Sequence, residues 1–378
     1  MSSVVTPPLG HSLPQVAAQN ASKVFIFGAG ASAADGAPLQ AHLFRKYAEI
    51  VQSHRNDYVH AASEGEMRTF FDLFWGADID STNLSAESFP TFEEALDLLE
   101  LANARGECFK AYGGLPHQAS RAHEARAHLI SLIATVIAEN LRHASVHHQA
   151  FVQALANLGW LNSTDFVSLN YDLLLDNALS ALAPAAPDYA ISFRNPSPPS
   201  AGTRIPKLLK IHGSLNWLFC PTCNQIDLFP GEKIAAEIVI NPGLMTCPVC
   251  QEPRTPIVIP PTFFKAMSNF YLQQIWKSAE ETLLKADHII FCGYSYPDAD
   301  LHFKYLIKRS EINRVSGARP PEVFIVNEHA GKDVAQREAE RDRFVRFFRN
   351  KGLVHLTKLS FSDLAADPTA YAASTSWI

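Results

Sequence analysis

The chain of 378 residues is long enough for two modest domains, or for one α/β domain that carries large insertions. A hydrophobic fraction of 47% and a charged fraction of 19% are typical of a globular protein with a full core. The net charge of −6 argues against electrostatic binding of nucleic acid over a broad surface. No apolar run reaches the roughly 18 residues that a membrane-spanning helix needs. We therefore expect no membrane insertion and no direct nucleic-acid binding.

Residues 1–22 are small and polar, lack the segments of a signal peptide, and predict a flexible N-terminal lead-in. Short apolar segments then alternate with helical ones. The expected strands are 23–27, 165–172, 207–214, 256–261, 288–295 and 321–327, and the expected later helices are 173–182, 275–286, 300–312 and 336–350. Residues 45–150 are helical in character, with amphipathic segments at 92–102 and 121–144. The pattern predicts an α/β fold, a parallel sheet covered by helices on both faces, with a helical insertion.

Polar residues or glycines stand at the ends of five expected strands. They are Gly28-Ala29-Gly30, Asn170-Tyr171-Asp172, His212-Gly213, Gly293-Tyr294-Ser295 and Val326-Asn327. Ligands of open parallel sheets bind along the carboxyl edge of the strands. We therefore expect these residues to form one composite site.

The stretch from Gly28 to Ala33 fits the pattern G-x-G-x-x-[G/A] between a strand and a helix. Such glycines allow a tight turn and a close approach of the backbone to a pyrophosphate, although similar turns also occur without a ligand. An acidic residue is expected about 20 residues later at a strand end. Glu49 falls there but inside a helical stretch, so the segment does not follow the pattern of the nucleotide-binding half of an ordinary dehydrogenase.

Four of the six cysteines form two Cys-x-x-Cys pairs, Cys220/Cys223 and Cys247/Cys250. With no secretory signal we expect a reducing cytoplasm, where this spacing favours a closed, structural Zn²⁺ site over disulfides. Redox dithiols or unrelated thiols are the alternative. The quartet supplies four ligands, so His212 is not needed there. Cys108 and Cys292 are expected to be buried thiols.

His212 and the Asn170–Asp172 segment each allow a structural and a functional interpretation. A histidine at a strand end can be a hydrogen-bonded structural residue, but one on the ligand edge is suited to accept a proton from water or a sugar hydroxyl. Asn170 and Asp172 can cap the following helix. Alternatively, the Asn170 amide positions a water or ribose and the Asp172 carboxylate binds an amide-bearing ring.

The basic C-terminal segment is most simply a solvated helix face. Its arginines are Arg337, Arg341, Arg343, Arg346 and Arg349. Acidic residues are interleaved with them, which weakens any case for nucleic-acid binding.

Together these motifs resemble the sirtuin (Sir2) superfamily. The series GAGASAADGAP, SLNYD, HG with a cysteine eight residues after the histidine, the two Cys-x-x-Cys pairs, GYS and IVN follows the family order from Lys23 to Asn327. The resemblance implies a Rossmann-like core at 23–44, 151–215 and 256–378, with the helical insertion at 45–150 and a zinc module at 216–255 beside an NAD cleft. It implies cleavage of the bond between nicotinamide and ribose.

The resemblance also implies a role for each matched residue. Gly28, Ala29, Gly30 and Ser32 would line the pyrophosphate of NAD⁺, and Gly293, Ser295 and Asn327 would hold its adenosine part. Asn170 and Asp172 would flank the nicotinamide end, with His212 as the general base near the ribose. Loss of neutral nicotinamide would leave an oxocarbenium-like sugar, the kind of cation formed in glycoside hydrolysis.

Two departures separate the chain from protein-deacylating sirtuins. Leu39-Gln40-Ala41 replaces the usual Asp-Phe-Arg, and IVIPPTFFK stands where a Phe-Gly-Glu segment would clamp an acyl-lysine peptide. Tyr171, the GYSYPDAD stretch and the helical insertion instead look like the Sir2-like NAD hydrolases of bacterial antiviral defence.

The leading interpretation is therefore an NAD glycohydrolase that yields nicotinamide and ADP-ribose. An NAD-dependent lysine deacylase and a non-catalytic sensor of NAD or ADP-ribose remain alternatives. Because unregulated NAD hydrolysis would poison the host, we expect regulation through a homo-oligomer or a partner protein. Segments 92–102 and 121–144 either form contact surfaces or pack on each other.

Overall fold

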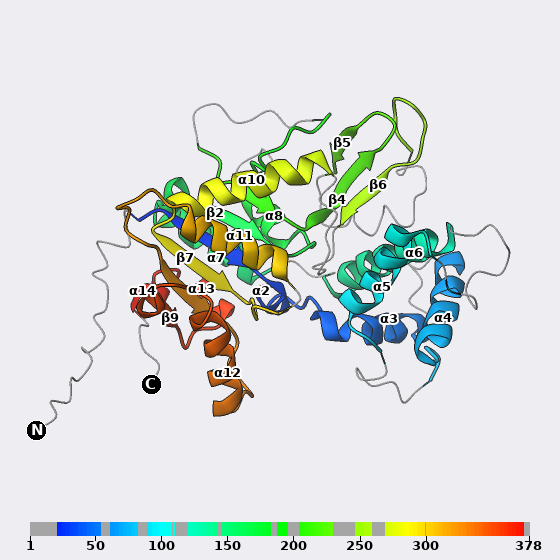
Figure 1. Ribbon diagram of the computed structural model, residues 1–378, viewed down its shortest axis with the longest axis horizontal. Coiled ribbons are helices and arrows are strands. Elements are labelled where there is room, and N and C mark those ends of the chain that lie inside the picture. The colour runs from blue at the N-terminus through cyan, green and yellow to red at the C-terminus, as the bar shows by residue number, and fades with distance from the viewer. Residues whose placement is uncertain are drawn as a thin grey trace, which may run out of the picture.

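The structure is a computed structural model. It describes residues 21–53, 61–81, 89–107, 109, 120–141, 145–182, 187–195, 204–229, 246–258, 269–298 and 300–373. In Figure 1 the main sheet and the helices around it lie at the left, the helical insertion lies at the right, and the smaller sheet lies above the insertion. The expected lead-in at 1–22 lies outside the described residues except for its last two.

Six parallel strands form the main sheet. In chain order they are β1 Lys23–Phe27, β2 Thr164–Ser168, β3 Leu208–Lys210, β7 His288–Cys292, β8 Glu322–Val326 and β9 Val354–Leu356. Their order across the sheet is β3-β2-β1-β7-β8-β9. Counted along the chain this is 3-2-1-4-5-6, the order of dinucleotide-binding Rossmann folds. The order reverses between β1 and β7, which is where such sheets bind ligands.

Helices cover both faces of this sheet, as predicted. Phe25 of β1 packs against Phe151 of α7 (His147–Asn157), with ring centroids 5.1 Å apart. Ile289 of β7 lies beside Ile307 of α11 (Leu301–Ile312). Because Ile289 pairs in register with Val24 and not with Phe25, it points to the opposite face. The remaining helices around the sheet are α2 Ala29–Ala33, α8 Leu174–Leu182, α10 Phe270–Lys285, α12 Val334–Val345, α13 Phe361–Ala366 and α14 Ala370–Ala373.

A second, antiparallel sheet carries the cysteine pairs. It consists of β4 Gly213–Cys220, β5 Gln225–Leu228 and β6 Thr255–Val258, in the order β5-β4-β6. The strand expected at 256–261 was taken as part of the alternating parallel pattern, and this was wrong: β6 pairs antiparallel with β4. A short apolar segment predicts a strand but not its partner. Residues 259–268 lie outside the described part.

The insertion folds around a core of its own. Its helices are α3 Leu43–Gln52, α4 Ala61–Trp75, α5 Phe92–Arg105 and α6 Ser120–Asn140. A capping box between Thr91 and Glu94 starts α5. The face of α5 that carries Leu96 and Leu99 is buried, as its amphipathic pattern predicted, and packs against α6. Of the two alternatives for segments 92–102 and 121–144, mutual packing is therefore what their described residues do.

A small apolar cluster connects the insertion with the rest of the molecule. Ile130 and Ala134 of α6 meet Tyr171 from the end of β2, Leu215 of β4 and Val258 of β6. The backbone N–H of Leu215 donates to the carbonyl of Tyr171 at 3.3 Å. The helical insertion, the main sheet and the small sheet thus meet at this apolar cluster.

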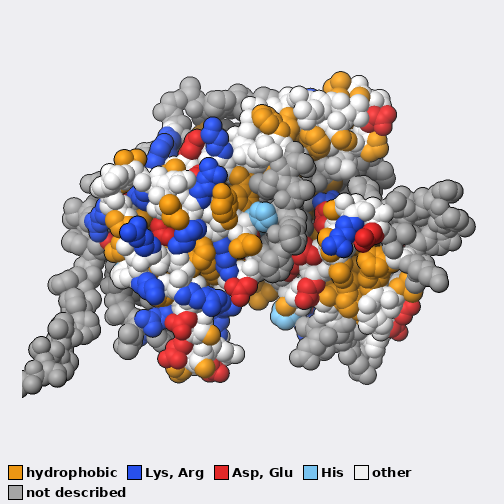
Figure 2. All heavy atoms as spheres, in the orientation of Figure 1, with side chains coloured by type: hydrophobic (Ala, Val, Ile, Leu, Met, Phe, Trp, Pro, Cys, Tyr) orange, Lys and Arg blue, Asp and Glu red, His pale blue; other side chains and the backbone are white. Residues whose placement is uncertain are grey.

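The surface of α12 carries mixed charge. Arg341 and Arg346 are exposed, and acidic side chains stand between the arginines. Figure 2 shows blue and red side chains intermingled over this helix, which fits the predicted solvated face. No helix in the described part of the chain has both the length and the apolar character to cross a bilayer.

Candidate functional site

A cavity of about 490 Å³ opens at the carboxyl edge of the main sheet, where β1 and β7 meet. Small-molecule sites usually measure roughly 300–1,000 Å³. Most of the predicted site residues come together here: the cavity is lined by Gly28, Ala29, Gly30, Asn170, His212, Gly293, Ser295 and Asn327. Ser32 and Asp172 are buried but do not line it.

The glycines at the cavity floor let two turns approach each other. A Cβ on Gly30 would lie 2.9 Å from the Cα of Gly293, and a Cβ on Gly293 would lie 1.9 Å from the backbone N of Ala31. The N–H of Gly30 donates to the carbonyl of Gly293 at 2.8 Å, and that of Gly28 to the carbonyl of Cys292 at 2.9 Å. Both N–H groups are therefore engaged within the fold, and the glycines shape the floor.

Asn170 is held in place by a buried polar network. Its amide nitrogen donates to the carbonyl of Gly28 and to Ser32 Oγ, each at 2.9 Å. Ser32 in turn donates to Asp172 at 2.7 Å. Asp172 also accepts from the N–H of Leu174 at 3.1 Å, at the start of α8, so part of its predicted capping role is observed. Ser32 and Asp172 thus support Asn170 from behind the cavity wall.

His212 follows β3 and is 2% exposed. Its Nδ1 lies 3.2 Å from the carbonyl oxygen of Leu169. A carbonyl can only accept, so Nδ1 carries the hydrogen and Nε2 of the neutral ring carries the lone pair. The ring is therefore held in the tautomer that a proton acceptor needs.

Two carboxylates enter the cavity near this histidine. Asp300, directly before α11, has Oδ1 3.7 Å from His212 Nε2, and its Oδ2 accepts a hydrogen bond from the Tyr294 hydroxyl at 2.9 Å. Glu93 comes from the first turn of α5 in the insertion. Burial, with the charges of Asp97 and Asp300 nearby, raises the pKa of Glu93 to about 7. This end of the cavity is therefore suited to a cationic group.

A model of the SIR2-like domain family matches residues 164–354, half of the chain. The chain belongs to the SIR2-like domain family. Membership implies an NAD-utilising enzyme. The matched segment of the SIR2-like domain includes His212 and both cysteine pairs, whereas the first glycine turn precedes it.

Solved Sir2 structures resemble this SIR2-like chain at low identity. A Sir2 homologue in complex with NAD is 16% identical, with 94% of this chain and 90% of that chain covered and a TM-score of 0.41. A triple mutant with 2′-O-acetyl ADP ribose is 14% identical, with 95% and 94% covered and a TM-score of 0.43. A Sir2 bound to a propionylated peptide is 12% identical, with 91% and 90% covered and a TM-score of 0.42. No curated protein matches the sequence.

At the opposite end of the SIR2-like cavity, Asn327 fixes the turn after β7. Its side chain accepts from the N–H of Tyr294 and donates to the carbonyl of Tyr294, both at 2.9 Å. The same amide donates to the buried carboxylate of Glu340 at 2.5 Å, and Lys332 donates to Glu340 at 2.8 Å. Asn327 therefore lines the cavity and also fixes the turn that carries Gly293 and Ser295.

The four cysteines predicted as zinc ligands lie together at one end of the small sheet. Their sulfur atoms are all within 4.8 Å of one another, with 3.5 Å between Cys220 and Cys250 and 3.9 Å between Cys223 and Cys247. A tetrahedral zinc with Zn–S bonds of about 2.3 Å places sulfurs about 3.8 Å apart. The group is compatible with a zinc module, and none of the four lines the cavity. Cys292 is buried as expected, and Cys108 lies outside the described residues.

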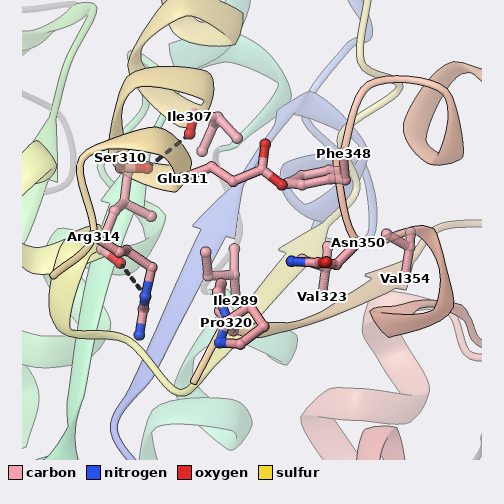
Figure 3. Close-up of a pocket in the computed structure, with 12 residues that line it drawn as sticks. Ile289, Ile307, Ser310, Glu311, Arg314, Pro320, Val323, Phe348, Asn350 and Val354 are labelled. Carbon is pink, nitrogen blue, oxygen red and sulfur yellow. Dashed lines mark hydrogen bonds between the residues drawn. The ribbon is translucent and has the colours of Figure 1, made fainter. Parts of the chain in front are cut away.

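A second hollow of the SIR2-like domain is unsuited to a ligand. It has a volume of about 20 Å³ between β7, β8 and α11, and Figure 3 shows its largely apolar lining with Ser310 hydrogen-bonded to the carbonyl of Ile307 at 2.8 Å. This volume suits one water molecule.

Sequence reasoning missed five charged residues of the main cavity, Glu93, Asp300, Glu328, Lys332 and Glu340. Asp300 belongs to the GYSYPDAD stretch that the sequence singled out, so a signal existed, but an acid before a helix is also an ordinary cap. Glu93 has no such signal, because nothing in its helix predicts docking against the sheet edge.

Proposed function

We propose that the chain hydrolyses NAD⁺ at the bond between nicotinamide and ribose, releasing nicotinamide and ADP-ribose. The observation that carries this proposal is the position of His212. It is a buried base held in one tautomer, and it lines a cavity at the point where Rossmann sheets bind dinucleotides. Family membership supports NAD as the substrate.

The dinucleotide would lie along the cavity with its nicotinamide end near Asn170 and His212. Its pyrophosphate would cross the turn of Gly28, Ala29 and Gly30, and its adenosine would lie toward Gly293, Ser295 and Asn327. Ser32 and Asp172 would contribute by fixing Asn170 and not by touching NAD⁺.

Hydrolysis of NAD⁺ requires stabilisation of a positive charge on the ribose and a base close to the attacking water. As the C1′–N bond breaks, its electrons neutralise the nicotinamide ring and positive charge moves to the ribose. Asp300 and Glu93 at this end favour that cation electrostatically. His212 Nε2 accepts a proton from the attacking water. The alternative acceptor is the acyl oxygen of a modified lysine, which would make the chain a deacylase.

For the four cysteines we propose a structural Zn²⁺ ion. Four thiolates would close its coordination shell and leave no position for substrate. Arg194, which donates to Cys247 Sγ at 3.3 Å and is paired with Asp227, would hold that ligand in place. Zinc would keep the turns of the small sheet together.

Regulation by self-association or by a partner, a cytoplasmic location and a role in antiviral defence stay predictions. They rest on the sequence resemblance and on the toxicity of unregulated NAD loss. A sensor that binds NAD or ADP-ribose without turnover is the non-catalytic alternative.

Mass spectrometry of NAD⁺ products, with and without an acetyl-lysine peptide, tests the proposal. Wild type should release ADP-ribose without peptide, and His212→Ala should reduce the rate at least ~100-fold. His147→Ala, on α7 away from the cavity, is the matched control and should leave the rate unchanged. Turnover that requires the peptide and yields acetyl-ADP-ribose would instead identify a deacylase. NAD⁺ or ADP-ribose binding without turnover would identify a sensor.

A further inference from the structure

The helical insertion contributes part of the cavity wall. The short helix η1 (Gln40–His42) and α5 both reach the cavity, α5 through the side chain of Glu93. Phe92, the residue before Glu93, is buried in the core of the insertion. The capping box of Thr91 and Glu94 fixes the same helical turn. Glu93 is therefore held against the cavity by a well-packed helix start.

Glu93 lies at the end of the cavity that carries His212. Burial raises the pKa of the Tyr171 phenol well above its usual range, and the charges of Glu93 and Asp300 raise it further, so both carboxyls lie near this phenol. The ring centroid of Tyr171 is 6.4 Å from that of His212, and Asp300 Oδ1 is 3.7 Å from His212 Nε2. This is the end where the nicotinamide is proposed to bind.

The positive side chain of the described cavity lining belongs to another segment. It is Lys332, which follows β8 and donates to the carboxylate of Glu340 at 2.8 Å. Lys332 therefore balances the charge of Glu340, and the carboxyls of Glu93 and Asp300 give their end of the cavity a negative potential.

NAD⁺ and its deamidated form differ at one group that would lie at this end. NAD⁺ carries a carboxamide on the pyridinium ring, whereas nicotinic acid adenine dinucleotide carries a carboxylate. A carboxamide offers two N–H donors, and a carboxylate can only accept. An ionised Glu93 can accept a hydrogen bond from the first group and repels the second. Asp172, the other acid predicted beside the ring, does not line the cavity.

We infer, on the basis of the proposed NAD⁺ hydrolysis, that Glu93 faces the substituent of the pyridinium ring and selects a carboxamide over a carboxylate. The helical insertion then takes part in substrate recognition, and its contribution is a repulsive charge against the wrong dinucleotide. Specificity often depends on such a repulsive element as much as on new attractive contacts.

The surroundings of Glu93 strengthen this repulsion. The backbone N–H of Glu93 donates to its own carboxyl and so orients it. Burial, with the charges of Asp97 and Asp300, sets its pKa at about 7, so the group is ionised at pH 8.5. A desolvated charge acts on its neighbours more strongly than one in water, because the local dielectric constant is lower.

Rates of ADP-ribose release from NAD⁺ and from nicotinic acid adenine dinucleotide, measured at pH 8.5, test this selectivity. Both substrates form the same ribose cation, so stabilisation of that cation cancels in the ratio of their kcat/KM values. Wild type should favour NAD⁺, and Glu93→Gln, which lacks the charge, should reduce the ratio at least ~10-fold. The neutral side chain avoids burial of a charge, so this variant should fold. Glu93→Asp keeps the charge and should retain most of the preference.

The matched control is Glu107→Gln, the same change in the same insertion. The Glu107 side chain is 65% exposed and does not line the cavity, so the ratio should stay at its wild-type value. An unchanged ratio in Glu93→Gln, or an equal fall in the control, overturns the selectivity but not the proposed function. If wild type releases no ADP-ribose, the proposed hydrolysis is overturned. The ratio of dissociation constants for the two dinucleotides, measured by calorimetry, then tests the selectivity of Glu93 by itself.

Discussion

The carbonyl oxygen of Leu169 lies 3.2 Å from Nδ1 of His212 and thereby leaves Nε2 as the nitrogen that faces Asp300. Leu169 belongs to the segment after β2, and His212 to the segment after β3. Two neighbouring strand ends of the main sheet therefore set the tautomer of the proposed base. The proposed chemistry depends on strand pairing as much as on the identity of the histidine.

Gly293→Ala should be strongly destabilising. The residue has φ +62°, and an added Cβ would lie 1.9 Å from the backbone N of Ala31. We expect a loss of more than about 3 kcal/mol in the free energy of unfolding, measured by chemical denaturation. Gly317→Ala is the matched control: it shares a positive φ of +86°, but no atom lies within 4 Å of the added Cβ. It should cost only about 1 kcal/mol. Equal losses would show that strain, and not the contact between turns, makes Gly293 necessary.

Asn170→Asp should destabilise the fold although it changes few atoms. The amide nitrogen of Asn170 donates to the carbonyl of Gly28 and to Ser32 Oγ. In the variant a carboxylate oxygen takes its place and faces the Gly28 carbonyl oxygen, which can only accept a hydrogen bond. We expect a loss of about 1–3 kcal/mol together with loss of NAD⁺ turnover. The exposed Asn162→Asp provides the control and should leave thermal stability within experimental error. A variant at Asn170 that is inactive but fully stable would point to a direct role without the structural one.

Glu93 should make stability depend on pH. Its pKa is raised from 4.5 to about 7 in the folded protein, so the folded state binds this proton more tightly than the unfolded chain. The corresponding stabilisation is complete below pH 4.5 and is lost as the pH rises through 7. Glu93→Gln, which stays neutral, should therefore be more stable than wild type by about 1–3 kcal/mol at pH 8.5 and nearly equal to it at pH 5.

Denaturation curves at the two pH values check this expectation, with the exposed Glu338→Gln as control. A gain of the same size at both pH values would mean that the carboxylate is not desolvated in the way its position indicates.

Removal of the proposed zinc should loosen the small sheet before the main sheet. Chelation, or Cys247→Ser, should lower the melting temperature by several degrees and reduce metal content from one zinc per chain, measured by atomic spectroscopy. Cys292→Ala is the control, because this thiol lies in β7 and outside the quartet. Purified protein that is stable and free of metal would contradict the assignment.

Several parts of the fold followed from the sequence because their signals are local. The buried runs at 23–27, 288–292 and 322–326 are strands as predicted, and their parallel pairing brought Gly28, Gly293 and Asn327 to one edge. The strand β9 was missed, since its three residues are only half buried and carry a weak apolar pattern. The partner of β6 was also missed, because pairing depends on the whole chain.

The candidate site shows the same division. His212 and Asn170 stand at strand ends and line the cavity, whereas Ser32 and Asp172 do not line it and form hydrogen bonds behind its wall; the ligand contacts predicted for all four stay predictions. A sequence pattern reports that residues are near a site but not which atoms face it. Asp300 and Glu93 face it because of tertiary packing, which no local pattern encodes.

The small cluster of Ile130, Tyr171 and Leu215 has a mechanical consequence. Tyr171 lies between Asn170 and Asp172, so a residue that packs against the helical insertion is joined by peptide bonds to two members of the polar network beside the cavity. Because close-packed side chains leave little room for independent shifts, we expect a displacement of α6 to move Tyr171 as well.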